Sequence, residues 1–146
     1  MKESGTKPDG IEIGNAWDMR SPDRPKTNWI VGNSPTIPAD SLRFMQQTND
    51  DGGVVGDSAT DIAIKWFVHN PDDDPTWGEN KPTSGGRTMS MLAGEGEFEL
   101  VFTKDNTTYT LMLNKPGDYA IWGPGLEHSW KPLKVSTILT VRWKPE

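Results

Sequence analysis

One stretch constrains the fold of this chain more than any other. Residues 117–130 read Gly-Asp-Tyr-Ala-Ile-Trp-Gly-Pro-Gly-Leu-Glu-His-Ser-Trp. The apolar and aromatic residues of Asp118–Trp122 predict a strand, and Pro124-Gly125 presets a tight turn. A second strand is then expected over Glu127–Lys131. Because a rigid turn aims the strand that follows it, we expect His128 to point into the interior of a small barrel.

Further strand signals recur at regular intervals from Asp61 to the end of the chain. Strands are predicted over Asp61–His69, Arg87–Leu92, Glu97–Thr103, Thr107–Leu113 and Ser136–Trp143. Lys104-Asp105-Asn106 predicts a hairpin turn between the third and fourth of these strands. The strands over Arg87–Leu92, Glu97–Thr103 and Thr107–Leu113 are expected to form a meander. Short strands joined by Gly and Pro turns indicate an all-β sandwich or barrel.

The first part of the chain differs from the rest in apolar density. Residues 1–60 contain 14 residues of the types Ile, Leu, Val, Phe, Trp, Met and Tyr, whereas residues 61–146 contain 28. A segment this polar cannot build a core alone. We therefore predict an extended N-terminal arm over residues 1–60, packed on a barrel of residues 61–146 or on a partner subunit. A short helical turn is expected near Ala39–Met45, and roughly the first eight residues are expected to be mobile.

Composition excludes several classes of protein and site. The 146 residues suit one domain with one core, and the absence of cysteine excludes disulfides, Cys-based zinc sites and thiol nucleophiles. The net charge of −6 argues against nonspecific binding to nucleic acid or anionic membranes. The N-terminus lacks an apolar signal core, and no apolar run reaches the roughly 18 residues that a membrane span needs. We expect a soluble, cytoplasmic protein.

Three short motifs occur in a fixed order and spacing. They are Leu92-Ala93-Gly94-Glu95-Gly96, Gly117-Asp118 and Pro124-Gly125-Leu126-Glu127-His128. Glycines permit sharp bends between strands, and Pro-Gly aims the next strand. Over roughly residues 62–143 this set resembles the cupin superfamily, in particular small single-domain bacterial cupins of the RmlC-like kind. The resemblance implies an antiparallel jelly-roll β-barrel.

The same resemblance implies a metal site that this chain has largely lost. In that family the first motif supplies two histidines and a glutamate, and the second motif supplies another histidine. Here the spacing puts Arg87 at the glutamate position and no histidine at the pair, so only His128 matches. One neutral imidazole cannot hold a transition metal tightly. No cofactor is therefore predicted, and a divalent transition metal would need a site rebuilt from His128 and His69, with Glu79 or Glu127.

Candidate ligand-binding residues follow from the alternation of side chains along a strand. Arg87, Met89 and Met91 are predicted to share the inward face. A buried guanidinium needs a partner, which we expect to be either a carboxylate such as Glu99 or Glu127, or an anionic ligand that replaces the metal. Trp130 shares a face with His128. The predicted ligand-binding set is Arg87, Met89, Met91, Tyr119, His128 and Trp130, with His128 also the candidate catalytic residue.

Several functions remain open on these residues. The first is binding of a small molecule in the barrel, an anion being the class that Arg87 would select. The second is a metal-independent epimerase or isomerase with His128 as acid/base, assisted by Tyr119 or Tyr109. The third is a metal-dependent oxygenase-type enzyme that uses His128 and His69, and the fourth is a structural or assembly role. Whether the protein is an enzyme is left open. The resemblance also implies a homodimer, for which exposed sheet edges give a physical motive.

Overall fold

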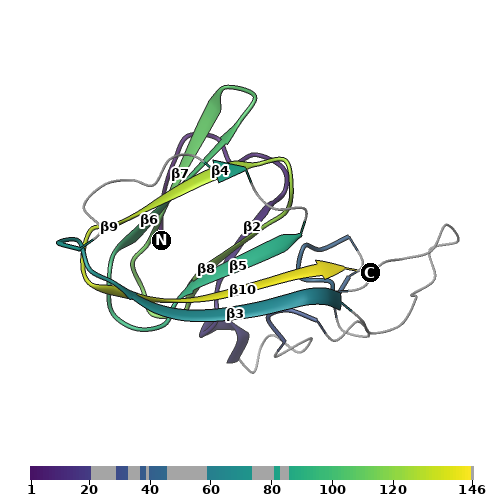
Figure 1. Cartoon of the computed structure of the whole chain (residues 1–146), viewed down its shortest axis with the longest axis horizontal. Helices are drawn as coiled ribbons and strands as arrows, with labels where there is room; N and C mark the ends of the chain where they lie inside the picture. Colours follow the sequence, from purple (N-terminus) through teal and green to yellow (C-terminus); the bar gives the residue numbers. More distant parts are fainter. Residues whose placement is uncertain are drawn as a thin grey trace, which may run out of the picture.

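The computed structural model describes residues 1–20, 29–32, 37–38, 40–45, 59–73, 81–82 and 86–145, and this part of the chain is all-β (Figure 1). Its strands are β1 (Lys2–Ser4), β2 (Ile11–Asn15), β3 (Ala59–His69), β4 (Lys81–Pro82), β5 (Arg87–Leu92), β6 (Phe98–Lys104), β7 (Thr107–Leu113), β8 (Asp118–Trp122), β9 (Glu127–Pro132) and β10 (Ser136–Pro145). A single turn of 3-10 helix, η1, covers Asp18–Arg20. All seven strands predicted from the sequence are confirmed. The described residues contain no helix of the length and apolarity that a membrane crossing requires.

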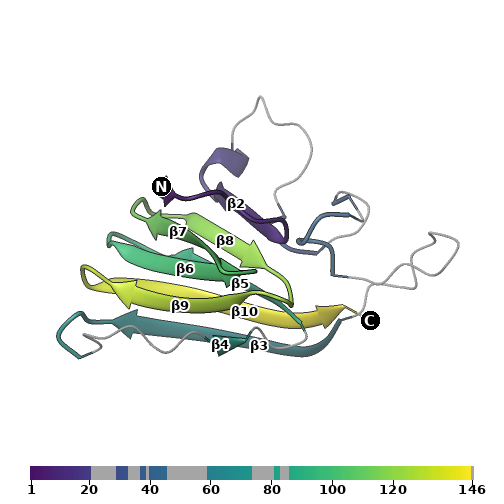
Figure 2. The same ribbon diagram turned by 90° about the horizontal axis from the view of Figure 1, so that it is seen from above.

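The strands form two antiparallel sheets that face each other (Figures 1 and 2). Sheet A has the order β1-β7-β6-β9-β4, and sheet B has the order β2-β8-β5-β10-β3. Consecutive strands such as β5 and β6 lie in opposite sheets, which is the connectivity of a jelly roll. The expected β5-β6-β7 meander is therefore wrong: β6 pairs with β7, but β5 pairs with β8 and β10.

The connection from β5 to β6 crosses between the sheets, and Gly96 allows this crossing. A Cβ atom at Gly96 would lie 2.5 Å from Ser136 Oγ, so a larger residue would collide with the start of β10. The Ser136 hydroxyl accepts a hydrogen bond from the backbone N–H of Glu97 at 3.1 Å. The chain thus passes from sheet to sheet through a close contact that glycine permits, rather than folding back as a hairpin.

The predicted turns have the backbone geometry that their residues favour. Asp105 and Asn106 join β6 to β7 with φ values of 49° and 61°, the left-handed pair that a two-residue hairpin requires. Gly125 follows Pro124 with φ of 88°, as in a turn with Pro and Gly at its centre. Both turn predictions are confirmed, so the direction of β9 is set locally.

The Gly117-Asp118 motif closes the turn before β8. Gly117 has φ of 87°, and Asp118 is only 2% exposed. The Asp118 carboxylate accepts hydrogen bonds from the backbone N–H groups of Asn114 and Lys115 at 3.1 and 2.9 Å, and from Asn15 Nδ2 at 2.8 Å. The aspartate therefore holds the turn closed and ties β2 to β8.

Most of sheet B is buried on both of its faces, whereas the outer face of its edge strand β3 is exposed. Its inner face joins the core between the sheets, where Leu92, Trp122 and Ile138 pack against Phe98 and other residues of sheet A. A second apolar cluster covers the outer face and is formed by Met89, Met91, Tyr119, Ile121 and Trp143. Residues from the N-terminal part of the chain pack onto this cluster; they are Ala16, Met19, Ile30, Val31, Leu42 and Met45.

The N-terminal part of the chain also contributes to both sheets. Lys2–Ser4 pair with β7, and Ile11–Asn15 pair with β8. The start of the chain, expected to be mobile, is thus hydrogen-bonded as an edge strand. Near the expected helical turn, Ser41 N donates to Pro38 O at 3.0 Å and Phe44 N donates to Ser41 O at 3.1 Å, which makes two successive turns. The division into arm and barrel stays a prediction.

Candidate functional site

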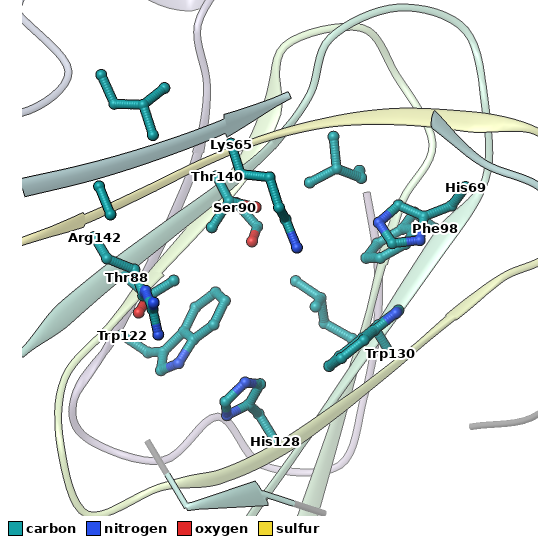
Figure 3. Close-up of a pocket in the computed structure, with 14 residues that line it drawn as sticks. Lys65, His69, Thr88, Ser90, Phe98, Trp122, His128, Trp130, Thr140 and Arg142 are labelled. Atoms are coloured by element: carbon teal, nitrogen blue, oxygen red, sulfur yellow. The ribbon is translucent and has the colours of Figure 1, made fainter. Parts of the chain in front are cut away.

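A pocket lies between the two sheets (Figure 3). It has a volume of about 360 Å³ and is lined by residues of β3, β5, β6, β8, β9 and β10. Strands from both sheets contribute, so its two walls can carry different side chains.

The wall formed by sheet B carries the cations and hydroxyl groups of the pocket, together with Ala63, Trp122 and Ile138. Two adjacent cross-strand rows build it, because Lys65 and Ser90 both pair with Thr140, while Arg142 pairs with Thr88. Thr88 and Ser90 are each only 6% exposed. Figure 3 shows the Lys65 and Arg142 side chains together with the hydroxyls on this side of the pocket. The described lining residues include no Asp or Glu.

The wall formed by sheet A is aromatic. Phe98 and Leu100 of β6 line it together with His128 and Trp130 of β9. The rings of His128 and Trp130 are stacked with centroids 6.4 Å apart. The rings of His128 and Trp130 lie across the pocket from Arg142 and Lys65 (Figure 3).

Two further rings connect the walls. Trp122 of β8 lies between Arg142 and His128, with its ring centroid 5.3 Å from that of His128 (Figure 3). His69, at the end of β3, is 5.0 Å from the Phe98 ring and 6.4 Å from the Trp130 ring. The aromatic surface therefore extends around the pocket beyond sheet A.

The structure brings three of the residues named from the sequence into this pocket. His128 and Trp130 line it from the same face of β9, as predicted, and His69 lines it as well. That His128 points into the barrel is confirmed. The binding and catalytic roles assigned to these residues stay predictions.

The other four members of the predicted set lie elsewhere. Arg87, Met89 and Met91 do share a face of β5, but that face is the outer one, and the prediction that it faces inward is wrong. Met89, Met91 and Tyr119 are 4%, 9% and 4% exposed because the N-terminal part of the chain covers them. They pack in the second apolar cluster rather than lining the pocket.

Arg87 binds backbone carbonyl groups instead of a carboxylate of the barrel or a ligand in the pocket. Its guanidinium donates to Ser41 O at 3.3 Å, to Leu42 O at 3.2 Å and to Phe44 O. Burial lowers the pKa of Arg87, and the nearby Glu12 partly opposes this shift. Glu12 itself accepts hydrogen bonds from Ser41 Oγ and Leu42 N. Arg87 and Glu12 therefore hold the 41–44 turn on sheet B.

Sequence reasoning missed the polar wall. Lys65, Thr88, Ser90, Thr140 and Arg142 were not in the predicted set, although each alternates with apolar residues along its strand. The signal was present in β10, where Thr140 and Arg142 alternate with Leu139, Val141 and Trp143. Hydroxyls and cations at every second position mark the pocket side of a strand whose other side is apolar.

The donor set in the described part of the pocket does not fit a transition metal. Such a site needs three or four imidazole, carboxylate or thiolate ligands. Among residues 1–20, 29–32, 37–38, 40–45, 59–73, 81–82 and 86–145, no three His, Asp or Glu side chains are grouped to hold a metal ion. His69 and His128 are instead accompanied by two cations. Glu79 lies outside the described residues, so the prediction on metals stays a prediction.

Comparisons with known proteins bear on the fold. No family model matches the sequence, and no curated protein matches it. The structure is similar to HEPD from Streptomyces albus with its substrate 2-hydroxyethylphosphonate and Fe(II) bound: TM-score 0.50 and 19% identity over 58% of this chain. It is also similar to the WlaRB TDP-quinovose 3,4-ketoisomerase from Campylobacter jejuni: TM-score 0.47 and 10% identity over 57% of this chain. The aligned regions span 18% and 62% of those two chains. At the level of fold, the cupin-type jelly roll predicted from the motifs is confirmed.

Proposed function

We propose that this cupin-fold protein binds a small anionic molecule in the pocket between its two sheets. The observation that carries the proposal is that Lys65 and Arg142 both line the pocket, while no Asp or Glu of the described residues does. Neither cation forms an ion pair with a carboxylate in the described part of the chain. Both side chains are exposed to solvent. Two cations at one site repel each other, and a bound anion would offset that repulsion.

The hydroxyl groups beside the cations support the same ligand class. Thr88 and Thr140 each lie next to Arg142 or Lys65 in the cross-strand rows, and Ser90 lies next to Thr140. Hydroxyl and guanidinium groups donate hydrogen bonds to oxyanions, and donors to a charged acceptor bind more strongly than donors to a neutral one. The local positive charge contrasts with the net charge of −6 of the whole chain, so it is a property of the pocket.

Anion binding is tested by comparing affinities before and after the removal of one cation. Calorimetric titration with acetate, phosphate and benzoate at constant ionic strength is expected to detect binding of at least one of them. Arg142→Met and Lys65→Met are each expected to weaken that binding by about tenfold or more, the loss of one charged hydrogen bond. Lys104→Met, at the exposed β6–β7 hairpin, removes a charge outside the pocket and should leave affinity unchanged. Equal affinity for all four proteins would contradict the proposal.

Catalysis in this pocket stays a prediction. His128 lines the pocket opposite the cations, which is where an acid or base would meet a bound anion. The assembly role also stays a prediction.

A further inference from the structure

We infer that the ligand is a small aromatic acid, with its anionic group at the wall of sheet B and its flat ring along the wall of sheet A. This inference rests on the proposed function and extends it, because anion binding alone says nothing about the rest of the ligand. The evidence for the aromatic ring is the difference between the two walls of the pocket.

The two walls differ in the chemistry that they offer. Lys65, Arg142 and the hydroxyls stand on one side, and His128 and Trp130 stand across from them (Figure 3). A ligand that uses both walls therefore has a charged end and an apolar, flat end. Aromatic rings pair with indole and phenyl groups by offset stacking or by edge-to-face contact, which adds to the effect of burying their area.

An aromatic ring fits the sheet A wall better than a sugar ring does. A sugar carries hydroxyl groups around its whole ring, and each one loses hydrogen bonds to water on burial unless the protein replaces them. Phe98 and Leu100 of this wall have no side-chain donor or acceptor, and neither has Ile138, which lines the pocket from sheet B. A sugar would leave hydroxyls unpaired against these residues, whereas an aromatic ring has none to satisfy.

The size of the pocket limits the ligand to a small molecule. Its volume of about 360 Å³ lies near the lower end of the roughly 300–1,000 Å³ that small-molecule pockets span. One ring with one acidic group suits this space. A carboxylate and a phosphonate present the same oxyanion chemistry to Arg142 and Lys65, so the experiment includes both.

Matched ligands separate the contribution of the charge from that of the ring. Benzoate and phenylphosphonate carry both features, cyclohexanecarboxylate and glucuronate carry the charge on a puckered ring, acetate carries the charge alone, and benzamide carries the ring alone. Calorimetric titration at millimolar concentrations and constant ionic strength is expected to show benzoate or phenylphosphonate binding at least about tenfold more tightly than the other four. Quenching of tryptophan fluorescence, through Trp122 and Trp130, provides a second readout.

Variants of one tryptophan test the position of the ring. Trp130→Leu is expected to weaken benzoate binding by about fivefold, within the range measured for aromatic pairs, and to change acetate binding little. Trp130→Phe should retain most of the affinity, which separates loss of the ring contact from misfolding. Trp29→Leu, an exposed residue outside the pocket, serves as the control and should bind benzoate as the unaltered protein does.

The outcomes distinguish the inference from the function on which it rests. If acetate, cyclohexanecarboxylate or glucuronate binds as tightly as benzoate and Arg142→Met weakens that binding, anion binding stands and the aromatic inference is overturned. Equal benzoate affinity in Trp130→Leu and the unaltered protein also overturns it. Both proposals fail if none of the acids binds. They also fail if benzamide binds as tightly as benzoate and Arg142→Met leaves the affinity for benzoate unchanged.

Discussion

The hydroxyl group of Tyr109 is buried beneath the N-terminal strand, where it donates a hydrogen bond to Glu3 of β1. Tyr109 is only 1% exposed. Burial raises the pKa of Tyr109 well above its ordinary value, and the hydrogen bond and negative charge of Glu3 raise it further. The folded protein thus keeps this proton at pH values where the unfolded chain, with a tyrosine pKa of about 10, releases it.

Stability should therefore fall as pH rises above about 10, because the unfolded state then binds fewer protons than the folded state. For Tyr109 alone the slope approaches about 1.4 kcal/mol per pH unit. The measurement is the free energy of unfolding by urea between pH 8 and 11, for the unaltered protein and for Tyr109→Phe. Lysine titration affects both proteins equally, so the difference isolates Tyr109. Parallel profiles for the two proteins would contradict the prediction.

β5 shows how far residue-level prediction reached. The bounds Arg87–Leu92 were predicted from the sequence to the residue, but the face assigned to the pocket was the wrong one. Alternation separates Met89 and Met91 from Thr88 and Ser90, and it cannot say which set faces inward when both faces are buried. Burial of the outer face depends on residues far away in the sequence, whose packing onto sheet B has no local signal; they are Ala16, Met19, Ile30, Val31, Leu42 and Met45.

The turn over residues 41–44 is the element whose position depends most clearly on one side chain. Arg87 donates to three of its carbonyl groups, and Glu12 accepts from Leu42 N and Ser41 Oγ. Arg87→Met should lower the free energy of unfolding by about 2–4 kcal/mol, because it removes charged hydrogen bonds and leaves buried carbonyls unpaired. The same variant should bind benzoate with unchanged affinity, since Arg87 does not line the pocket.

Urea denaturation and calorimetric titration of the same samples provide both readouts. Arg43→Met is the matched control: Arg43 Nε lies 3.7 Å from Glu12 Oε2, a half-buried ion pair beyond hydrogen-bond distance that contributes roughly 1 kcal/mol or less. A normally stable Arg87→Met protein that has lost its ligand affinity would restore the role assigned to Arg87 from the sequence and contradict the structure.

Strands and turns were more predictable than the pairing of strands. The φ values of Asp105, Asn106 and Gly125 follow from the local preferences of these residues, so the β6–β7 hairpin and the turn before β9 could be located. By contrast, β5 and β6 are joined by a connection about as short as a hairpin loop. For this reason the sequence predicted that the two strands pair in a meander. The contact of Gly96 with Ser136, which allows the crossover, joins residues 40 positions apart in sequence, where local patterns give no information.

At the scale of the whole molecule, the described residues leave an apolar surface exposed on β3. β3 is the edge strand of sheet B, and the apolar residues on its outer face are largely exposed: Ile62 at 55%, Ile64 at 70%, Trp66 at 64% and Val68 at 53%. This row continues the outer face of β10, where Leu139 pairs with Trp66 and Val141 pairs with Ile64. A long, exposed apolar edge strand favours pairing with another chain.

We expect a second copy of this chain to cover this row, which gives the predicted homodimer a specific surface. A twofold axis at β3 brings the row of one copy against the same row of the other, so one set of residues buries two apolar surfaces.

Trp66→Lys should shift the protein from dimer to monomer. The measurement is light scattering after size-exclusion chromatography over a range of protein concentrations. Trp17→Lys makes the same substitution at another exposed tryptophan, just after β2 at the opposite edge of sheet B, and should stay dimeric. Because Trp66 is not among the lining residues, the monomer should keep its affinity for benzoate. A monomeric unaltered protein, or a dimer that persists in Trp66→Lys, would contradict this assignment.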